Sequence, residues 1–145
     1  MAGLEGYRSE FGEYPVPSVT GVTVNLDGHD YDASGALMLY QALSGDGDDH
    51  IKTALPGKHA SDGRLDDDEL KHIYLSDMPR EMIRKTEVGY MLVDGFGHPN
   101  QYTPGGAECV NDTFDLWSFA EAAPCAQINK LAKEAEAAAR WIKNW

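Results

Sequence analysis

The stretches Asp94-Gly-Phe-Gly-His-Pro-Asn-Gln-Tyr102 and Phe114-Asp-Leu-Trp-Ser118 decide the fold of this chain. The first places two glycines and a proline among aromatic residues, which is the composition of a turn between strands. The second alternates large apolar and polar residues, as a strand with one buried face does. With the apolar run at 88–93, these stretches predict an antiparallel β-meander over 88–119.

Helices are predicted before the meander. Leu4, Tyr7 and Phe11 share one helical face in a first helix over 1–14. The αβ region 15–87 should hold an extended segment at 19–25 and an acid-initiated helix at 66–74. Between them, a helix capped by Asp32 or Ser34 and stopped by the glycines at 45 and 47 is expected. Its apolar face consists of Leu37, Met38, Tyr40, Ala42 and Leu43.

The end of the chain has a different pattern. Apolar residues recur at intervals of three and four from Ile128 to Trp145, in a background of Ala, Lys and Glu. This spacing predicts a C-terminal helix over 124–145, with about four turns. We expect it to dock through Leu131, Ile142 and Trp145.

Composition limits the possible functions. A length of 145 residues favours one domain, and 12 basic against 24 acidic residues give a net charge of −12. Such a charge repels phosphate backbones, so nucleic acid is not an expected partner. There is no apolar run of the roughly 20 residues that would span a bilayer, and no secretory leader. The sequence is therefore expected to be either cytoplasmic or without its front end.

No catalytic residue set is visible, and an enzyme is not expected. The five histidines have no metal-ligand spacing, and nucleophile elbows, phosphate loops and dinucleotide fingerprints are missing. Acidic clusters at 27–32, 46–50 and 66–69 lack the spacing of an EF-hand, so solvated loops or helix starts are favoured over cation sites. The two cysteines, Cys109 and Cys125, are either reduced core residues or a disulfide.

Four motifs resemble those of type II secretion pseudopilins and related type IV pilin-like proteins. They are Tyr7-Arg-Ser-Glu-Phe-Gly-Glu-Tyr14-Pro15, the Asp94 hairpin, the Phe114 strand and the terminal Ile142-Lys-Asn-Trp145, and they follow the family's order. The resemblance implies an α+β fold in which the N-terminal helix packs on a small antiparallel sheet, with additional helices including a C-terminal one. The motif positions are Tyr14, Pro15, Asp94, Gly97, Pro99, Tyr102, Asp115, Trp117 and Trp145.

The resemblance also implies a role. A pseudopilin is a structural subunit at the periplasmic face of the inner membrane, which self-assembles through an N-terminal apolar helix and contacts other pseudopilins and inner-membrane secretion proteins. That apolar half-helix does not occur in this sequence. One alternative is a type IV pilus subunit for adhesion or motility. Another is a small acidic module that binds a protein or glycan through Trp117, Trp141 and Trp145.

The chain departs from the family at its calcium loop. Major pseudopilins hold Ca²⁺ between the Trp-Ser strand and the Asn-Trp end, whereas the interval 119–141 of this chain has no aspartate. Because Ca²⁺ requires six to eight converging oxygen ligands, we expect the family's calcium site to be absent. The hypothesis is that the C-terminal helix and a bond between Cys109 and Cys125 replace it.

Overall fold

The chain forms three α-helices and three small antiparallel sheets in the part that the computed structural model describes, residues 2–46, 61, 63–65, 70, 73–124, 129–134 and 141–144. This is a mixed α/β architecture. In chain order the elements are α1 (Ala2–Phe11), β1 (Thr23–Leu26), β2 (His29–Asp32), α2 (Ser34–Ser44), the 3-10 turn η3 (Arg80–Met82), β3 (Ile83–Thr86), β4 (Gly89–Leu92), β5 (Gln101–Pro104), β6 (Phe114–Ser118), α3 (Lys130–Glu134) and β7 (Ile142–Lys143). None of the helices described is long and apolar enough to cross a membrane.

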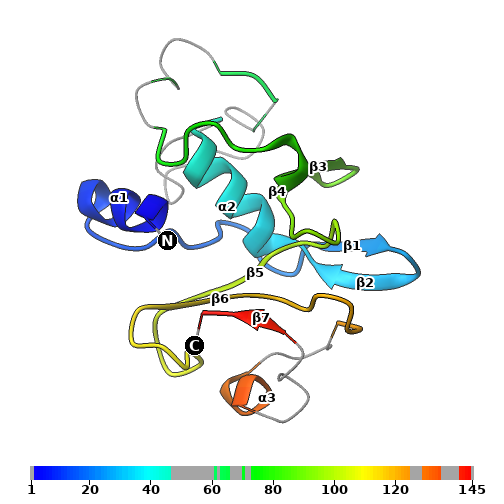
Figure 1. The fold of residues 1–145 in the computed structure, drawn as a ribbon. Coiled ribbons are helices and arrows are strands. Elements are labelled where there is room, and N and C mark those ends of the chain that lie inside the picture. Colours follow the sequence, from blue (N-terminus) through cyan, green and yellow to red (C-terminus); the bar gives the residue numbers. More distant parts are fainter. Residues whose placement is uncertain are drawn as a thin grey trace.

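Helix α2 organises the molecule. It contacts α1, β4 and β5, and Figure 1 shows it between α1 on one side and the β3–β4 hairpin on the other. The N-cap residue is Ala33, which makes no side-chain cap, so the cap predicted at Asp32 or Ser34 is wrong in position; Asp32 Oδ1, one residue earlier, accepts the Ser34 amide over 2.8 Å. Gly45 ends it in the left-handed conformation, at φ 79°.

Helix α1 lies close to its neighbours because two of its residues are glycines. A Cβ on Gly3 would stand 2.9 Å from a methyl carbon of Leu43, and one on Gly6 would stand 2.9 Å from the Tyr74 ring. Both distances are too short for a real side chain, so the glycines allow the close approach. Leu4 and Tyr7, on the predicted apolar face, are 2% and 1% exposed.

The sheets are separate. β1 pairs with β2, β3 pairs with β4, and the third sheet has the order β5-β6-β7, all antiparallel. An isolated bridge between Val93 and Pro99 links the residue after β4 to the segment just before β5. Two apolar clusters fill the spaces between them: one joins α1 and α2 to Tyr102 and Phe114, and the other joins β1 and β2 to Trp117 and Trp141.

The predicted meander over 88–119 has its three strands, but the pairing of the first one differs. β4 forms its ladder with the preceding β3 and meets the segment before β5 only at the Val93–Pro99 bridge. The reason is a tight turn at residues 87–88, in which the Val88 amide donates to Thr86 Oγ1 and Gly89 has a φ of 127°. A positive φ at this glycine closes a hairpin that the apolar pattern alone does not indicate.

The C-terminal helix predicted over 124–145 is also wrong in part. α3 covers Lys130–Glu134, whereas Ile142–Lys143 is β7 and pairs with the edge of β6. The open edge of β6 offers unpaired backbone groups, and Trp141 is buried beside it, so sheet pairing overrides the helical spacing. The helix predicted at 66–74 falls largely outside the described residues, and Trp145 does so entirely.

Candidate functional site

The turn after β4 is built around the carboxylate of Asp94. Its Oδ1 accepts the backbone amides of Phe96 (2.8 Å) and His98 (3.0 Å), and its carbonyl accepts the Gly97 amide (3.0 Å). Gly97 has a φ of 78°, a conformation that favours glycine. The predicted motif positions Asp94 and Gly97 therefore have a structural task, which is to fold this loop on itself.

The same carboxylate joins the loop to β6. The Ser118 hydroxyl donates to Asp94 Oδ2 and accepts the Ala120 amide over 2.9 Å. Pro99, also a motif position, is buried, and its carbonyl accepts the side-chain amide of Gln101 over 3.1 Å. Sequence reasoning placed these segments in one sheet, but it did not identify the Asp94–Ser118 contact that joins them.

His98 connects this loop to the β1–β2 hairpin. Its Nδ1 lies 3.2 Å from the carbonyl oxygen of Ala120, and its Nε2 lies 3.3 Å from Asp27 Oδ2. The imidazole stacks on Tyr31, with ring centroids 4.9 Å apart. Three chain segments thus meet at one side chain that the sequence did not single out.

Tyr14 and Pro15 connect α1 to β6, the middle strand of the third sheet. The Tyr14 hydroxyl donates to Glu5 over 2.6 Å, and its ring meets that of Phe114 edge-on, with centroids 4.9 Å apart. Pro15 is fully buried. Asn144 contacts the same strand from the other end of the chain, because its Oδ1 accepts the Leu116 amide over 2.9 Å.

Three aromatic residues of the third sheet and its flank are core residues, whereas Phe96 of the Asp94 hairpin, also expected in the core, is 46% exposed. Tyr102 is 9% exposed, Trp117 is 4% exposed and Trp141 is 6% exposed. The Trp141 ring stacks on Trp117 (6.3 Å between centroids) and meets Phe119 edge-on (4.9 Å). Burial raises the pKa of the Tyr102 hydroxyl. Neither Trp117 nor Trp141 therefore offers a solvent-facing ring to a ligand, and Trp145, the third residue of the binding-module alternative, lies outside the described residues.

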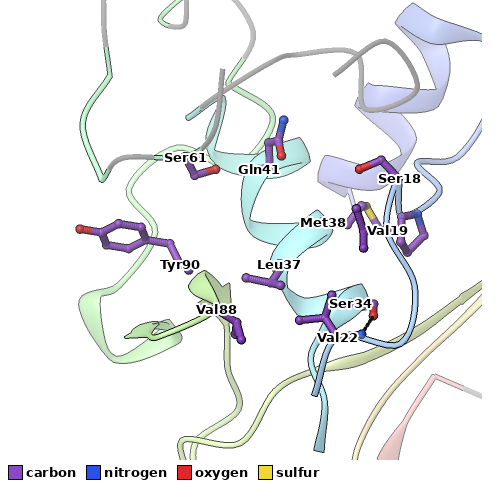
Figure 2. Close-up of a pocket in the computed structure, with 12 residues that line it drawn as sticks. Ser18, Val19, Val22, Ser34, Leu37, Met38, Gln41, Ser61, Val88 and Tyr90 are labelled. Atoms are coloured by element: carbon purple, nitrogen blue, oxygen red, sulfur yellow. Dashed lines mark hydrogen bonds between the residues drawn. The ribbon is translucent and has the colours of Figure 1, made fainter. Parts of the chain in front are cut away.

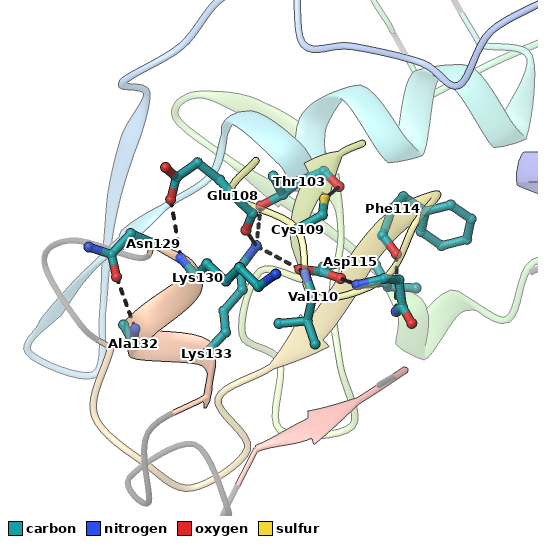
Figure 3. A network of polar contacts seen from close by, with 12 residues as sticks. Thr103, Glu108, Cys109, Val110, Phe114, Asp115, Asn129, Lys130, Ala132 and Lys133 are labelled. Carbon is teal, nitrogen blue, oxygen red and sulfur yellow. Dashed lines mark hydrogen bonds and ion pairs between the residues drawn. The ribbon is translucent and has the colours of Figure 1, made fainter. Parts of the chain in front are cut away.

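A buried ion pair underlies the β5–β6 hairpin (Figure 3). Lys133 Nζ lies 2.8 Å from Asp115 Oδ2, and both side chains are 0% exposed. Burial alone would raise the pKa of Asp115, but the hydrogen bonds from Lys133 and from the amides of Asn111 and Val110 outweigh it and leave that pKa lowered. Asp115 was predicted as a motif position. Its partner was missed, since Lys133 appeared as one of several lysines on a helix surface.

Cys109 is a buried free thiol in the structure. Its Sγ donates to the carbonyl oxygens of Thr103 (3.4 Å) and Pro104 (3.3 Å), and burial raises its pKa. Cys125 lies outside the described residues, so whether the two cysteines pair stays a prediction. The C-terminal segment is held by other contacts.

The predicted docking of the C-terminal segment is reversed. Leu131 and Ile142 are 77% and 63% exposed, whereas Lys133 and Trp141 are buried. A charged residue thus occupies the inner face of α3. The helical spacing of apolar residues did not predict this, because an ion pair rather than apolar contact sets the orientation of the helix.

In the described residues, the aspartates of the acidic clusters contact other groups of the chain. Asp27 faces His98, Asp30 accepts the Asn25 side-chain amide over 2.8 Å, and Asp32 accepts the Ser34 amide just before α2. Asp46 is 1% exposed and accepts the Tyr40 hydroxyl over 2.7 Å. Within the described ranges, no three His, Cys, Asp or Glu side chains are gathered as a metal site would require. The cluster at 66–69 falls outside them.

One cavity of about 310 Å³ opens beside α2 (Figure 2). Leu37, Met38, Val22 and Val88 give it an apolar wall, and the polar groups on its rim are hydroxyls and an amide rather than paired acids and bases. Ser34 Oγ accepts the Val22 amide over 3.0 Å. This lining suits a small apolar group, and it contains neither a nucleophile with a base nor a set of metal ligands.

Comparison with known proteins returned no family whose description matches the chain, no matching characterised protein and no matching solved structure.

Proposed function

We infer that this protein is a structural subunit of a pilus-like polymer, a pseudopilin of a type II secretion-like system that moves proteins by assembly rather than by catalysis. The observation that carries the inference is the convergence of the motifs on one strand, β6. Tyr14 packs on Phe114, Asp94 binds Ser118, and Asn144 binds the Leu116 amide. The segments lie far apart in the sequence, so their common task is to build a scaffold.

The chemistry of the described residues supports a structural role. The half-buried carboxylate of Asp94 accepts three hydrogen bonds that hold its own loop and β6, and Asp115 is paired with Lys133. Such groups are fully occupied in the folded state and are poorly placed to transfer protons to a substrate. In this proposal the protein acts at the periplasmic face of the inner membrane, with other pseudopilins and inner-membrane secretion proteins as partners.

The gene sequence upstream of Met1 is the first test. The proposal requires an apolar segment of about 20 residues that continues directly into α1, preceded by a processing site. A gene that encodes no such segment overturns the proposal. The same fold without a polymer-forming helix would instead point to a binding module.

The second test is deletion of the gene in its host, with complementation by the wild-type gene. We expect proteins that are normally secreted to accumulate folded in the periplasm, and secretion to return on complementation. Intact secretion together with loss of surface fibres, adhesion or motility would favour the type IV pilus alternative. Unchanged secretion and unchanged fibres would contradict both assignments.

A further inference from the structure

The ammonium group of Lys133 sits in a complete oxygen cage. Its Nζ donates to Asp115 Oδ2 (2.8 Å), Glu108 O (2.7 Å) and Thr103 Oγ1 (3.0 Å), as Figure 3 shows. An ammonium has three N–H donors, and here each one has an oxygen acceptor. The face of Trp117 lies 4.8 Å from Nζ. The groups around Nζ therefore provide one acceptor for each N–H, a negative charge and an aromatic ring, which together suit a primary ammonium cation.

The cage is held by the backbone as well as by the lysine. Asp115 lies within β6, and its two carboxylate oxygens accept the amides of Val110 (2.8 Å) and Asn111 (2.9 Å). These bonds hold the loop between β5 and β6 around the carboxylate. The Asp115 carboxylate is therefore also held by contacts within the hairpin, in addition to its contact with α3.

Lys133 is the residue through which α3 meets the rest of the domain. It is the buried residue of this helix, and the apolar side chain of Leu131 is 77% exposed. At its start, the Lys130 amide donates to Glu108 Oε2 over 3.1 Å. Polar contacts to one loop thus attach the helix where apolar packing would be expected.

We propose that Thr103, Glu108 and Asp115 form a binding site for a primary ammonium cation, and that Lys133 is its tethered ligand, which locks the C-terminal segment onto the β5–β6 hairpin. The inference does not depend on the proposed function. It makes two claims that can be tested: the amine of Lys133 is protected in the native protein, and the site accepts a free alkylammonium ion once the side chain is removed.

The first experiment uses the wild-type protein and an amine-acetylating reagent, with peptide mass spectrometry over time. Lys130 is the matched control, because it lies on the same helix and is exposed. We expect Lys130 to react rapidly and Lys133 to react at least about 100-fold more slowly, since a charged and buried amine reacts only after opening. Equal rates would overturn the proposal. An intact mass one water short would also overturn it, because it would show an amide bond between Lys133 and Asp115.

The second experiment uses Lys133→Ala, which removes the equivalent of n-propylammonium. The variant should lose roughly 10 °C or more in unfolding midpoint, because it leaves a buried carboxylate without its cation. Added n-propylammonium should restore the midpoint in a saturable way, whereas NaCl at equal ionic strength should not. In Lys133→Ala with Asp115→Asn the recovery should disappear. The binding-site claim would be overturned if n-propylammonium failed to raise the unfolding midpoint of the single variant, or if it still raised that of the double variant.

Lys133→Met keeps the volume of the side chain and removes the charge, and it covers the case in which Lys133→Ala fails to fold. We expect it to be less stable than the wild type, and the pair Lys133→Met with Asp115→Asn to recover part of that loss. A Lys133→Met protein as stable as the wild type would show that the ammonium is not needed. It would overturn the claim that Lys133 holds the C-terminal segment on the β5–β6 hairpin.

Discussion

Replacing Asp94 by alanine should destabilise the domain more than any other change in the loop after β4. The substitution removes the acceptor for two backbone amides and for the Ser118 hydroxyl. The Phe96 amide lies at an exposed position, so its bond contributes little, whereas the bonds from His98 and Ser118 are partly buried. At about 1.5 kcal/mol for each partly buried bond to a charged group, the loss is about 3 kcal/mol.

Urea unfolding measures this loss. With a slope of about 2 kcal/mol per molar, a loss of about 3 kcal/mol lowers the midpoint by about 1.5 M. Asp94→Asn keeps one oxygen acceptor and the shape of the side chain, so it should lose only about 1 kcal/mol. Asp30→Ala is the matched control, since it removes an exposed carboxylate that accepts one side-chain amide in the β1–β2 hairpin. Its loss should stay within about 0.5 kcal/mol.

The reasoning would be refuted by equal losses in Asp94→Ala and Asp30→Ala. It would also be refuted if Asp94→Ala lost less than about 1 kcal/mol, because the three bonds would then be replaced by water without cost. A selective loss confined to Asp94→Ala would identify the motif aspartate as the group that holds the loop to β6.

Four other predictions follow from the geometry. Gly3→Ala should lower the thermal midpoint despite a gain in helix propensity of about 1 kcal/mol, because its Cβ would stand 2.9 Å from a leucine methyl of α2. Trp141→Ala should cost about 3–5 kcal/mol in urea unfolding, whereas Leu131→Ala, at an exposed position, should stay within about 0.5 kcal/mol. The pKa of Asp115 is lowered in the folded state, so on acidification the unfolded chain binds a proton at this group before the folded chain does. The stability that Asp115 contributes should therefore be present above about pH 5 and be lost as the pH falls below 3.8, the ordinary pKa of the group. Urea midpoints measured across that pH range would show the loss. Cys109 should react with a thiol reagent only on unfolding, and the denatured, unreduced chain should titrate both cysteines; a titre of zero would show the disulfide instead.

The sequence predicted the elements whose signals are local. Leu4 and Tyr7 lie on the buried face of α1, and α2 lies in the predicted segment and ends at Gly45, as the sequence indicated. Strands β5 and β6 lie where alternation placed them. In each case the pattern of neighbouring residues was sufficient, because helical spacing, a glycine stop and strand alternation act over a few residues.

The errors arose where contacts between distant residues decide. Ile142 continues a helical pattern of apolar residues, yet it forms a strand because its backbone pairs with the edge of β6. Lys133 resembles a surface lysine, yet a buried aspartate 18 residues earlier in the chain binds it. A buried aspartate at 115 was itself the usable signal, because a carboxylate inside a strand needs a cation or several donors, and the sequence between 119 and 141 offered lysines but no calcium ligands.

The pairing of the strands has a consequence for how quickly the domain forms. β1 with β2, and β3 with β4, are hairpins closed by two residues, and β5 pairs with the next strand in the chain. Such local pairings have a low contact order, and their loops close at little entropic cost. The slow step should be the pairing of β7 with β6, because the chain between these two strands must close a longer loop than the two-residue hairpin turns. Refolding followed at Trp141 should therefore lag behind hairpin formation, and the last part to fold would be the edge that closes the third sheet.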